Sequence, residues 1–338
     1  MSAMLLNKEK WPDFIGKLAG KELWAPQVDS NGLRFAPVAE GEVPSLDFSN
    51  TRVPPKEVVF PQTETLFRFK SGSEELKQPQ PGKERVLLGV RPCDARSMKI
   101  IDKLFNWDEE DPYYLKRREQ VTLVGLACTE PGLNCFCTSV NGGPASTEGL
   151  DLLMVDLGES YFLEQVTKKG GSLLEEVKEL LEETGNDSQE QKESIAGEAA
   201  NKIKRSIDTE GIPAGLPGLW EDPLWQRVSA SCLGCGTCTY LCPTCHCFDI
   251  QDETEGQEAR RCRMWDSCMF REYTLHASGH NPRSTRRERT RNRINHKYNY
   301  YVDKFDVIAC VGCGRCINLC PVNIDIVDVL GQVKEALR

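Results

Sequence analysis

Residues 232–243 read CLGCGTCTYLCP, and residues 310–321, CVGCGRCINLCP, repeat the same cysteine spacing. Each copy reads C-x2-C-x2-C-x3-C-P, the pattern that holds a pair of [4Fe-4S] clusters in two-cluster ferredoxins. In that pattern the first three cysteines of each run bind one cluster and the fourth binds the other. The spacing therefore predicts two crossed ligand sets, Cys232, Cys235, Cys238 and Cys320 on one cluster and Cys310, Cys313, Cys316 and Cys242 on the other.

Zinc is the alternative metal for paired C-x2-C spacings. A structural zinc site uses four ligands and has no need of a third C-x2 step. Small residues also stand between the cysteines of both runs, where they let the backbone close on inorganic sulfide. They are Gly234, Gly236, Gly312 and Gly314. Two complete copies of the run therefore favour iron–sulfur clusters over zinc.

Length and composition indicate a cytoplasmic chain with more than one domain. Its 338 residues are too many for one small ferredoxin module. In a reducing compartment its 16 cysteines indicate metal binding rather than disulfides. Residues 1–13 carry Lys8, Glu9 and Lys10 before any apolar run, which is unlike a signal peptide. The sequence also has no run of about 18 apolar residues that would cross a membrane. The net charge of −9 argues against nucleic acid as a partner.

The overall class that we predict is α+β, with a mixed α/β domain at residues 1–170 followed by a helical connection and a ferredoxin domain. The apolar runs VLLGV at 86–90 and VTLVGL at 121–126 are typical of buried parallel strands, and a helix at 94–104 joins them. The other elements that we expect in this domain are a helix at 8–18, extended pieces at 22–25 and 33–36, and a hairpin at 152–157 and 161–166.

Residues 171–220 are expected to connect the domains through helices. Ser172 and Glu175 form a capping-box pattern at the start of one helix, which Gly185 ends. We expect a polar loop at 186–193 and a second helix at 196–207.

The last domain, residues 221–338, is expected to be a helical two-cluster ferredoxin. The two cysteine runs are separated by 67 residues, from Pro243 to Ala309, which is far more than a compact bacterial ferredoxin allows. Helices are expected within this insertion at 265–277 and 284–301, and a C-terminal helix at 324–337.

A further metal site is expected in the first domain. Cys93 comes just after the first of the two buried strands and Cys128 just after the second, and Cys135 and Cys137 lie in the loop that follows. Because open α/β sheets build their sites at the carboxyl ends of neighbouring parallel strands, these thiols are expected to converge. We interpret them as ligands of a third [4Fe-4S] cluster, with zinc or four unrelated buried thiols as the alternatives.

The remaining four cysteines give no clear metal pattern. They are Cys245, Cys247, Cys262 and Cys268. Four thiolates suffice for a metal site, but free cysteines are common in protein cores. We favour packing or weak S–H contacts for these four.

A positively charged run follows in the sequence. It contains Arg283, Arg286, Arg287, Arg289, Arg291, Arg293 and Lys297, opposed by Glu288 alone. Such a run is usually a solvated helix face. Beside anionic clusters it is also suited to raising their potentials or docking an acidic partner.

Nine short motifs run in order along the chain. They are PKE at 55–57, FPQ at 60–62, GVRPCD at 89–94, DPYY at 111–114, CFC at 135–137, CPTC at 242–245, WDSC at 265–268, GHNPR at 279–283 and HK at 296–297. Together they resemble one family over nearly the whole chain, the iron–sulfur β subunits of soluble sulfhydrogenases and the related iron–sulfur subunits of anaerobic sulfite reductases. Cys262 has no clear counterpart in this family.

The resemblance implies a non-catalytic electron-transfer subunit of an oxidoreductase complex. Members lie beside a flavin-containing subunit that oxidises or reduces NAD(P)H, and they pass electrons to a separate catalytic subunit. The chain itself has no G-x-G-x-x-G fingerprint, Walker A loop, G-x-S-x-G elbow or nickel-binding Cys-x-x-Cys pair near its termini. Two alternatives stay open: a reductase that acts on a small molecule at the N-terminal iron–sulfur site, and a redox-sensing regulatory protein.

Overall fold

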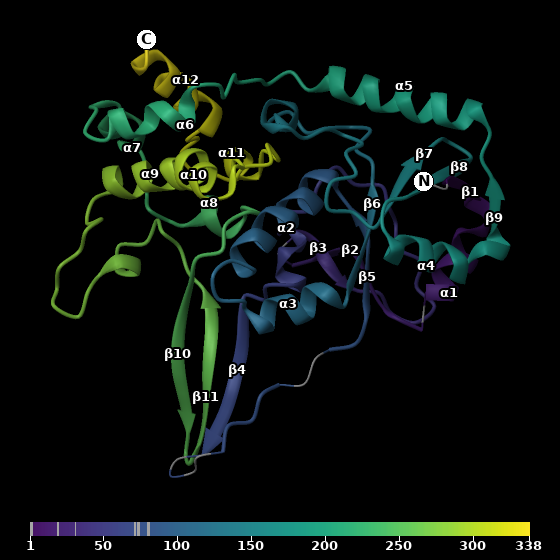
Figure 1. Cartoon of the computed structure of the whole chain (residues 1–338), viewed down its shortest axis with the longest axis horizontal. Helices are drawn as coiled ribbons and strands as arrows, with labels where there is room; N and C mark the ends of the chain where they lie inside the picture. The colour runs from purple at the N-terminus through teal and green to yellow at the C-terminus, as the bar shows by residue number, and fades with distance from the viewer. Residues whose placement is uncertain (1–2, 19, 31, 71, 73–74, 80–81) are drawn as a thin grey trace.

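The computed structural model describes residues 3–18, 20–30, 32–70, 72, 75–79 and 82–338. A β-sheet flanked by helices lies beside a helical region that carries both cysteine runs, and a narrow three-stranded arm projects below them (Figure 1). The other residues, which include the first two of the expected N-terminal domain, lie outside this description.

The N-terminal sheet has eight strands within the described residues, in the order β3-β2-β5-β6-β7-β8-β1-β9. Strands β2, β5, β6 and β7 run parallel, and the other neighbouring pairs are antiparallel. The predicted pair of parallel strands and the predicted hairpin, β7 with β8, are confirmed. The strand bounds are β1 (Ala3–Asn7), β2 (Glu22–Asp29), β3 (Gly32–Pro37), β5 (Arg85–Val90), β6 (Val121–Leu126), β7 (Leu152–Asp156), β8 (Ser160–Gln165) and β9 (Leu181–Glu183).

Both faces of this sheet are buried under helices. In strand β5, Leu87 packs into one core and Leu88 into the other, because successive side chains of a strand point to opposite faces. Both faces are buried, so the sequence of this strand is a continuous apolar run. Helices α2 and α3 contribute to the first core, and α1 and α4 to the second. Their bounds are α1 (Trp11–Leu18), α2 (Pro92–Phe105), α3 (Pro112–Glu119) and α4 (Lys168–Glu176).

The arm joins the two halves of the chain. It consists of β4 (Thr63–Lys70), β10 (Phe248–Glu255) and β11 (Glu258–Trp265), in the order β10-β11-β4. The expected helix at 265–277 is therefore wrong: Trp265 ends a strand, and the 3-10 helix η6 (Glu272–Thr274) is the helical element that follows. The charged residues of the arm form cross-strand pairs, such as Asp252 with Arg261.

The connecting region also departs from the prediction. Helix α4 begins earlier than expected, since the Thr167 side chain, and not Ser172, caps it. The 3-10 helix η4 (Lys178–Leu180) follows, and the next residues form β9, which pairs with β1. The loop expected at 186–193 is wrong, because α5 (Asn186–Lys202) is one continuous helix over this stretch and ends before residue 207.

The C-terminal region is mainly helical and has a core of its own around Trp225, Tyr298 and Leu330. Its helices are α6 (Ile212–Gly215), α7 (Leu224–Ser229), α8 (Thr237–Tyr240), α9 (Arg286–Asn295), η7 (His296–Tyr300), α10 (Tyr301–Phe305), α11 (Arg315–Asn318) and α12 (Ile326–Ala336). The expected helices at 284–301 and 324–337 are confirmed, apart from their ends. Among the residues described, none of the helices has the length and apolarity that a bilayer crossing requires.

The close packing of α4 on the sheet generates a stability prediction. A Cβ atom on Gly170 would overlap the carbonyl oxygen of Asp151, so Gly170→Ala should lower the free energy of unfolding by about 1–3 kcal/mol. Gly197 in the exposed part of α5 has open space, so Gly197→Ala should stabilise by up to about 1 kcal/mol. Anaerobic denaturant unfolding, followed by circular dichroism, measures the free energy of unfolding of both variants. Equal changes in the two variants would contradict the close contact between Gly170 and Asp151.

Candidate metal centres

A pocket beside the first cysteine run brings together cysteines from both runs. Its lining includes Cys232, Cys235 and Cys238 from the loop before α8 and its first turn, and Cys320, which lies beyond α11. The sulfur of Cys320 accepts a hydrogen bond of 3.2 Å from the backbone nitrogen of Ile324. The four cysteines of the first crossed set thus face one space.

This pocket fits an iron–sulfur cluster in its turns and in its charge. Gly236 has a φ of +75°, and a Cβ atom there would lie 2.7 Å from the ring of Phe270, so the turn between Cys235 and Cys238 requires glycine. The described lining carries one charged side chain, Arg293, and no carboxylate. A cationic lining suits a set of four thiolates around a cluster, whose net charge is negative.

The second crossed set also lies together. Helix α8, which precedes Cys242, packs against α11, and the latter carries Cys316. Burial raises the pKa of Cys316 to about 12, and the thiols of Cys310 and Cys242 act in the same direction because they are close neighbours. Burial likewise raises the pKa of Cys313, with Cys242 among its neighbours. Such buried thiols ionise when a metal takes the place of the proton, which is the behaviour of cluster ligands.

The third candidate set lines a single pocket at the carboxyl ends of β5 and β6. Cys93 lies in the first turn of α2, Cys128 follows β6, and Cys135 and Cys137 come from the next loop. Burial raises the pKa of Cys137 to about 11, with the nearby thiols of Cys135 and Cys128 acting in the same direction. The structure brings the four thiols together, and their binding of a cluster stays a prediction.

The third pocket adjoins the second cysteine set directly. Cys313 belongs to the second set and also lines the third pocket. The nitrogen of Phe136 donates to the carbonyl oxygen of Gly312 at 2.8 Å, and the thiol of Cys135 lies 3.8 Å from the carbonyl oxygen of Cys313. A Cβ atom on Gly312 would lie 2.5 Å from the nitrogen of Cys137, so this close approach requires glycine.

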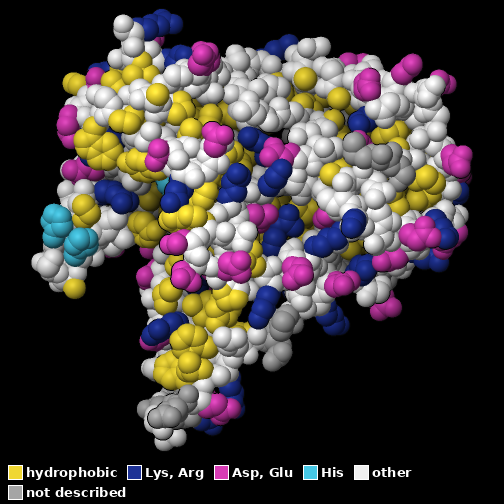
Figure 2. Space-filling view, in the orientation of Figure 1, with side chains coloured by type: hydrophobic (Ala, Val, Ile, Leu, Met, Phe, Trp, Pro, Cys, Tyr) yellow, Lys and Arg dark blue, Asp and Glu magenta, His cyan; other side chains and the backbone are white. Residues whose placement is uncertain are grey.

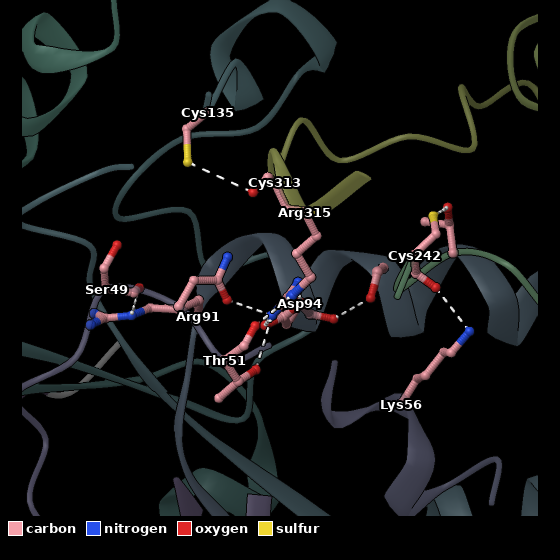
Figure 3. A network of polar contacts seen from close by, with 12 residues as sticks. Ser49, Thr51, Lys56, Arg91, Asp94, Cys135, Cys242, Cys313 and Arg315 are labelled. Carbon is pink, nitrogen blue, oxygen red and sulfur yellow. Dashed lines mark hydrogen bonds and ion pairs between the residues drawn. The ribbon is translucent and has the colours of Figure 1, made fainter. Parts of the chain in front are cut away.

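A buried ion pair joins the two sets, and sequence reasoning missed it. Arg315 donates to both carboxylate oxygens of Asp94, at 2.6 and 2.7 Å, and to the carbonyl oxygen of Thr51 at 2.8 Å (Figure 3). Both side chains are almost inaccessible to solvent, at 3% and 1%. Burial disfavours the charge on Arg315, but Asp94 outweighs it and holds the arginine pKa above its usual value. The available signals were the charged residues beside Cys93 and between Cys313 and Cys316.

The basic run is not a solvated face, which corrects the expectation for most of it. Arg289, Arg291, Arg293 and Lys297 are buried, whereas Arg286 is exposed. The inward side chains reach backbone carbonyls, aromatic rings and cysteine sulfurs. Positive and negative side chains are interspersed on the visible face of the molecule (Figure 2). Docking of an acidic partner along the whole run is therefore excluded by burial.

The four remaining cysteines do not form one group. Cys262 lies within β11 opposite Gln251, four residues along the hairpin from Cys247, or about 13 Å at the usual strand rise. Cys247 and Cys268 are neighbours, and Cys245 contacts Cys242 of the second set. Cys262 is buried within β11, as the packing interpretation expects, and for the other three cysteines that interpretation stays a prediction.

Within the described part of the chain, no three His, Cys, Asp or Glu side chains are placed to chelate a single metal ion. Thiolates around a cubane each bind a different iron, so they stand farther apart than the ligands of one zinc ion.

The crossed arrangement generates a test by substitution. Cys320→Ser should remove the same electron paramagnetic resonance signal as Cys232→Ser, because both side chains line the first pocket. Cys242→Ser should remove a different signal, the one that Cys310→Ser also removes. Cys262→Ser, a buried position within β11, is the matched control and should leave iron content and signals unchanged. If Cys320→Ser instead removes the signal that Cys310→Ser removes, and leaves the signal of Cys232→Ser intact, the crossed arrangement is contradicted.

The chain is similar to known proteins in two respects. A family model described as a 4Fe-4S dicluster domain matches residues 231–324, which contain both cysteine runs and support two [4Fe-4S] clusters. Over 344 aligned residues that cover 100% of both chains, the sequence is 32% identical to sulfhydrogenase 2 subunit beta of Pyrococcus furiosus. No solved structure matches the chain. The chain therefore belongs to the family of iron–sulfur β subunits of sulfhydrogenases.

Proposed function

We propose that this chain relays electrons through three [4Fe-4S] clusters, between a flavin-containing subunit that reacts with NAD(P)H and a separate catalytic subunit. Each cluster supplies one-electron exchange when bound. The relative from Pyrococcus furiosus is by its name one subunit of a larger sulfhydrogenase, which supports a role beside partner subunits. The proposal includes a cytoplasmic location, where thiols outside the clusters stay reduced.

The observation that carries the proposal is the order of the three cysteine sets. Cys316 of the second set is close enough to Cys238 of the first for their charges to interact. Cys313, also of the second set, lines the pocket of the third. The set formed by Cys242, Cys310, Cys313 and Cys316 therefore lies between the other two, and we call it the central site. A continuous row of one-electron sites supports a relay.

The outer sites have exposed edges on which partners are able to dock. Cys235 of the first set is exposed, and its neighbour Leu233 is 58% exposed. In the loop of the third set, Leu133 is 94% exposed. At the central site Cys242 and Cys310 are buried. An accessible site at each end and a more enclosed one between them suit transfer from one partner to another.

Reduction of a small molecule at the third pocket is less well supported. Four thiols line this pocket, and four thiolates occupy the outer coordination position of every iron in a cubane. That arrangement leaves no iron open to a substrate. We therefore assign the third site to the relay.

The first test is the iron content. Three clusters require about twelve irons per chain with matching sulfide, and two require about eight. Replacing Cys135 and Cys137 together by serine should lower the larger value to the smaller and leave the signals of the other two sites intact. Cys262→Ser again serves as the control. An unchanged iron content in the double variant would overturn the third cluster.

The second test concerns the partner. The purified, iron-loaded chain should accept electrons from a strong artificial reductant but should not oxidise NAD(P)H, because hydride oxidation needs a cofactor that splits an electron pair into single steps. Adding the flavin-containing subunit should start NAD(P)H-dependent reduction of the chain. Rapid oxidation of NAD(P)H by the chain alone, without flavin, would show that it is not only a relay.

A further inference from the structure

Lys297 is a buried lysine in contact with a predicted cluster ligand. Its side chain is 3% exposed. Its Nζ atom lies 3.1 Å from the sulfur of Cys242, 3.0 Å from the hydroxyl of Thr244 and 3.1 Å from the carbonyl oxygen of Ala309. Among the residues that the structure describes, no carboxylate pairs with this ammonium group. A buried charge needs a compensating one, and the predicted thiolate of Cys242 is in contact with it, with Cys245 and Cys310 also near enough to favour the charge.

A π-helical turn directs this lysine toward the central site. Lys297 lies in η7, between α9 and α10, and turns of this kind interrupt the regular spacing of side chains along a helix. The carbonyl oxygen of Lys297 also accepts a 2.8 Å hydrogen bond from the nitrogen of Ala309, the residue before Cys310. Lys297 is thus tied to both chain segments that supply the central site, one through Cys242 and one through Cys310.

Two further cations act near the central site. Lys56 is 2% exposed and donates to the carbonyl oxygens of Cys242 and Cys245, at 2.8 and 2.6 Å. Arg293 lines the first pocket, but its charge also acts on Cys316, so it lies between the first and central sites. Its Nε atom has no hydrogen-bond partner within the described part of the chain.

The charges near the third site are arranged differently. Arg315 lies between the central and third sites, and Asp94 neutralises it. Arg91 lines the third pocket and donates mainly to backbone carbonyl oxygens, including that of Ala127 at 2.8 Å. The third site therefore has one uncompensated cation, and the central site has two lysines and a share of Arg293.

We propose that Lys297 gives the central site the highest reduction potential of the three, so that an electron entering the row rests there. The inference builds on the proposed relay. Adding an electron makes a site more negative, and both a nearby cation and a hydrogen bond to a ligand sulfur stabilise that state. Lys297 provides both to the sulfur of Cys242. It is a positioning residue, since it acts through Cys242.

The test is a redox titration followed by electron paramagnetic resonance. In the iron-loaded wild type, the signal with the highest midpoint potential should be the one that Cys310→Ser removes. Lys297→Gln and Lys297→Met should shift that midpoint to more negative potential and leave the other two nearly unchanged. Lys297→Arg, which keeps the charge, should shift it less. Lys304→Met, an exposed lysine of α10, is the matched control and should shift none.

The outcomes separate this inference from the proposed relay. Iron content and dependence on the flavin partner test the relay, and neither depends on Lys297. The inference is overturned if the highest potential in the wild type belongs to the signal removed by Cys232→Ser or Cys135→Ser. It is equally overturned if Lys297→Gln keeps its iron and all three midpoints. If a substitution at Lys297 prevents iron loading, the inference is still tested in the wild type, by which cysteine substitution removes the signal of highest potential.

Discussion

The buried ion pair between Arg315 and Asp94 is the interaction on which the rest of the arrangement depends. Arg315 stands between two cysteines of the central site, and Asp94 follows Cys93 of the third, so the pair ties the N-terminal sheet region to the C-terminal helical region. Removing one partner of such a pair typically costs about 3–5 kcal/mol, since the other charge stays buried. The pair therefore holds the N-terminal sheet in one position against the cysteine runs.

Several positively charged side chains are buried beside the cysteine sets. The chain carries a net charge of −9, yet Arg293 and Lys297 are turned inward. Buried cations without carboxylates are unfavourable in an ordinary core, and they become favourable beside thiolates and clusters of negative charge. The inward run of basic residues is thus a consequence of what the cysteines hold, and it leaves the surface with charges of both signs.

The sequence predicted those features that depend on local spacing. The crossed cysteine sets follow from two short runs, and the gathering of Cys93 and Cys128 follows from the parallel strands that precede them. What it did not predict depends on distant partners. Residues 258–265 form β11 between β10, the other strand of its hairpin, and β4, and the pairing with β4 joins segments far apart in the sequence, which no local pattern shows. The direction of Lys297 depends on a π-helical turn, which helical periodicity does not reveal.

Contacts of several kinds join the N-terminal sheet region to the cysteine runs. Strand β4 pairs with β11, Lys56 donates to the carbonyl oxygens of Cys242 and Cys245, and Asp94 binds Arg315. The last two of these contacts end on the segments that carry the cysteines themselves. Electron transfer between sites slows steeply with distance, so a relay gains from a rigid separation between them. A hinge between the two regions would change the gap from the central to the third site, and these contacts oppose such a hinge.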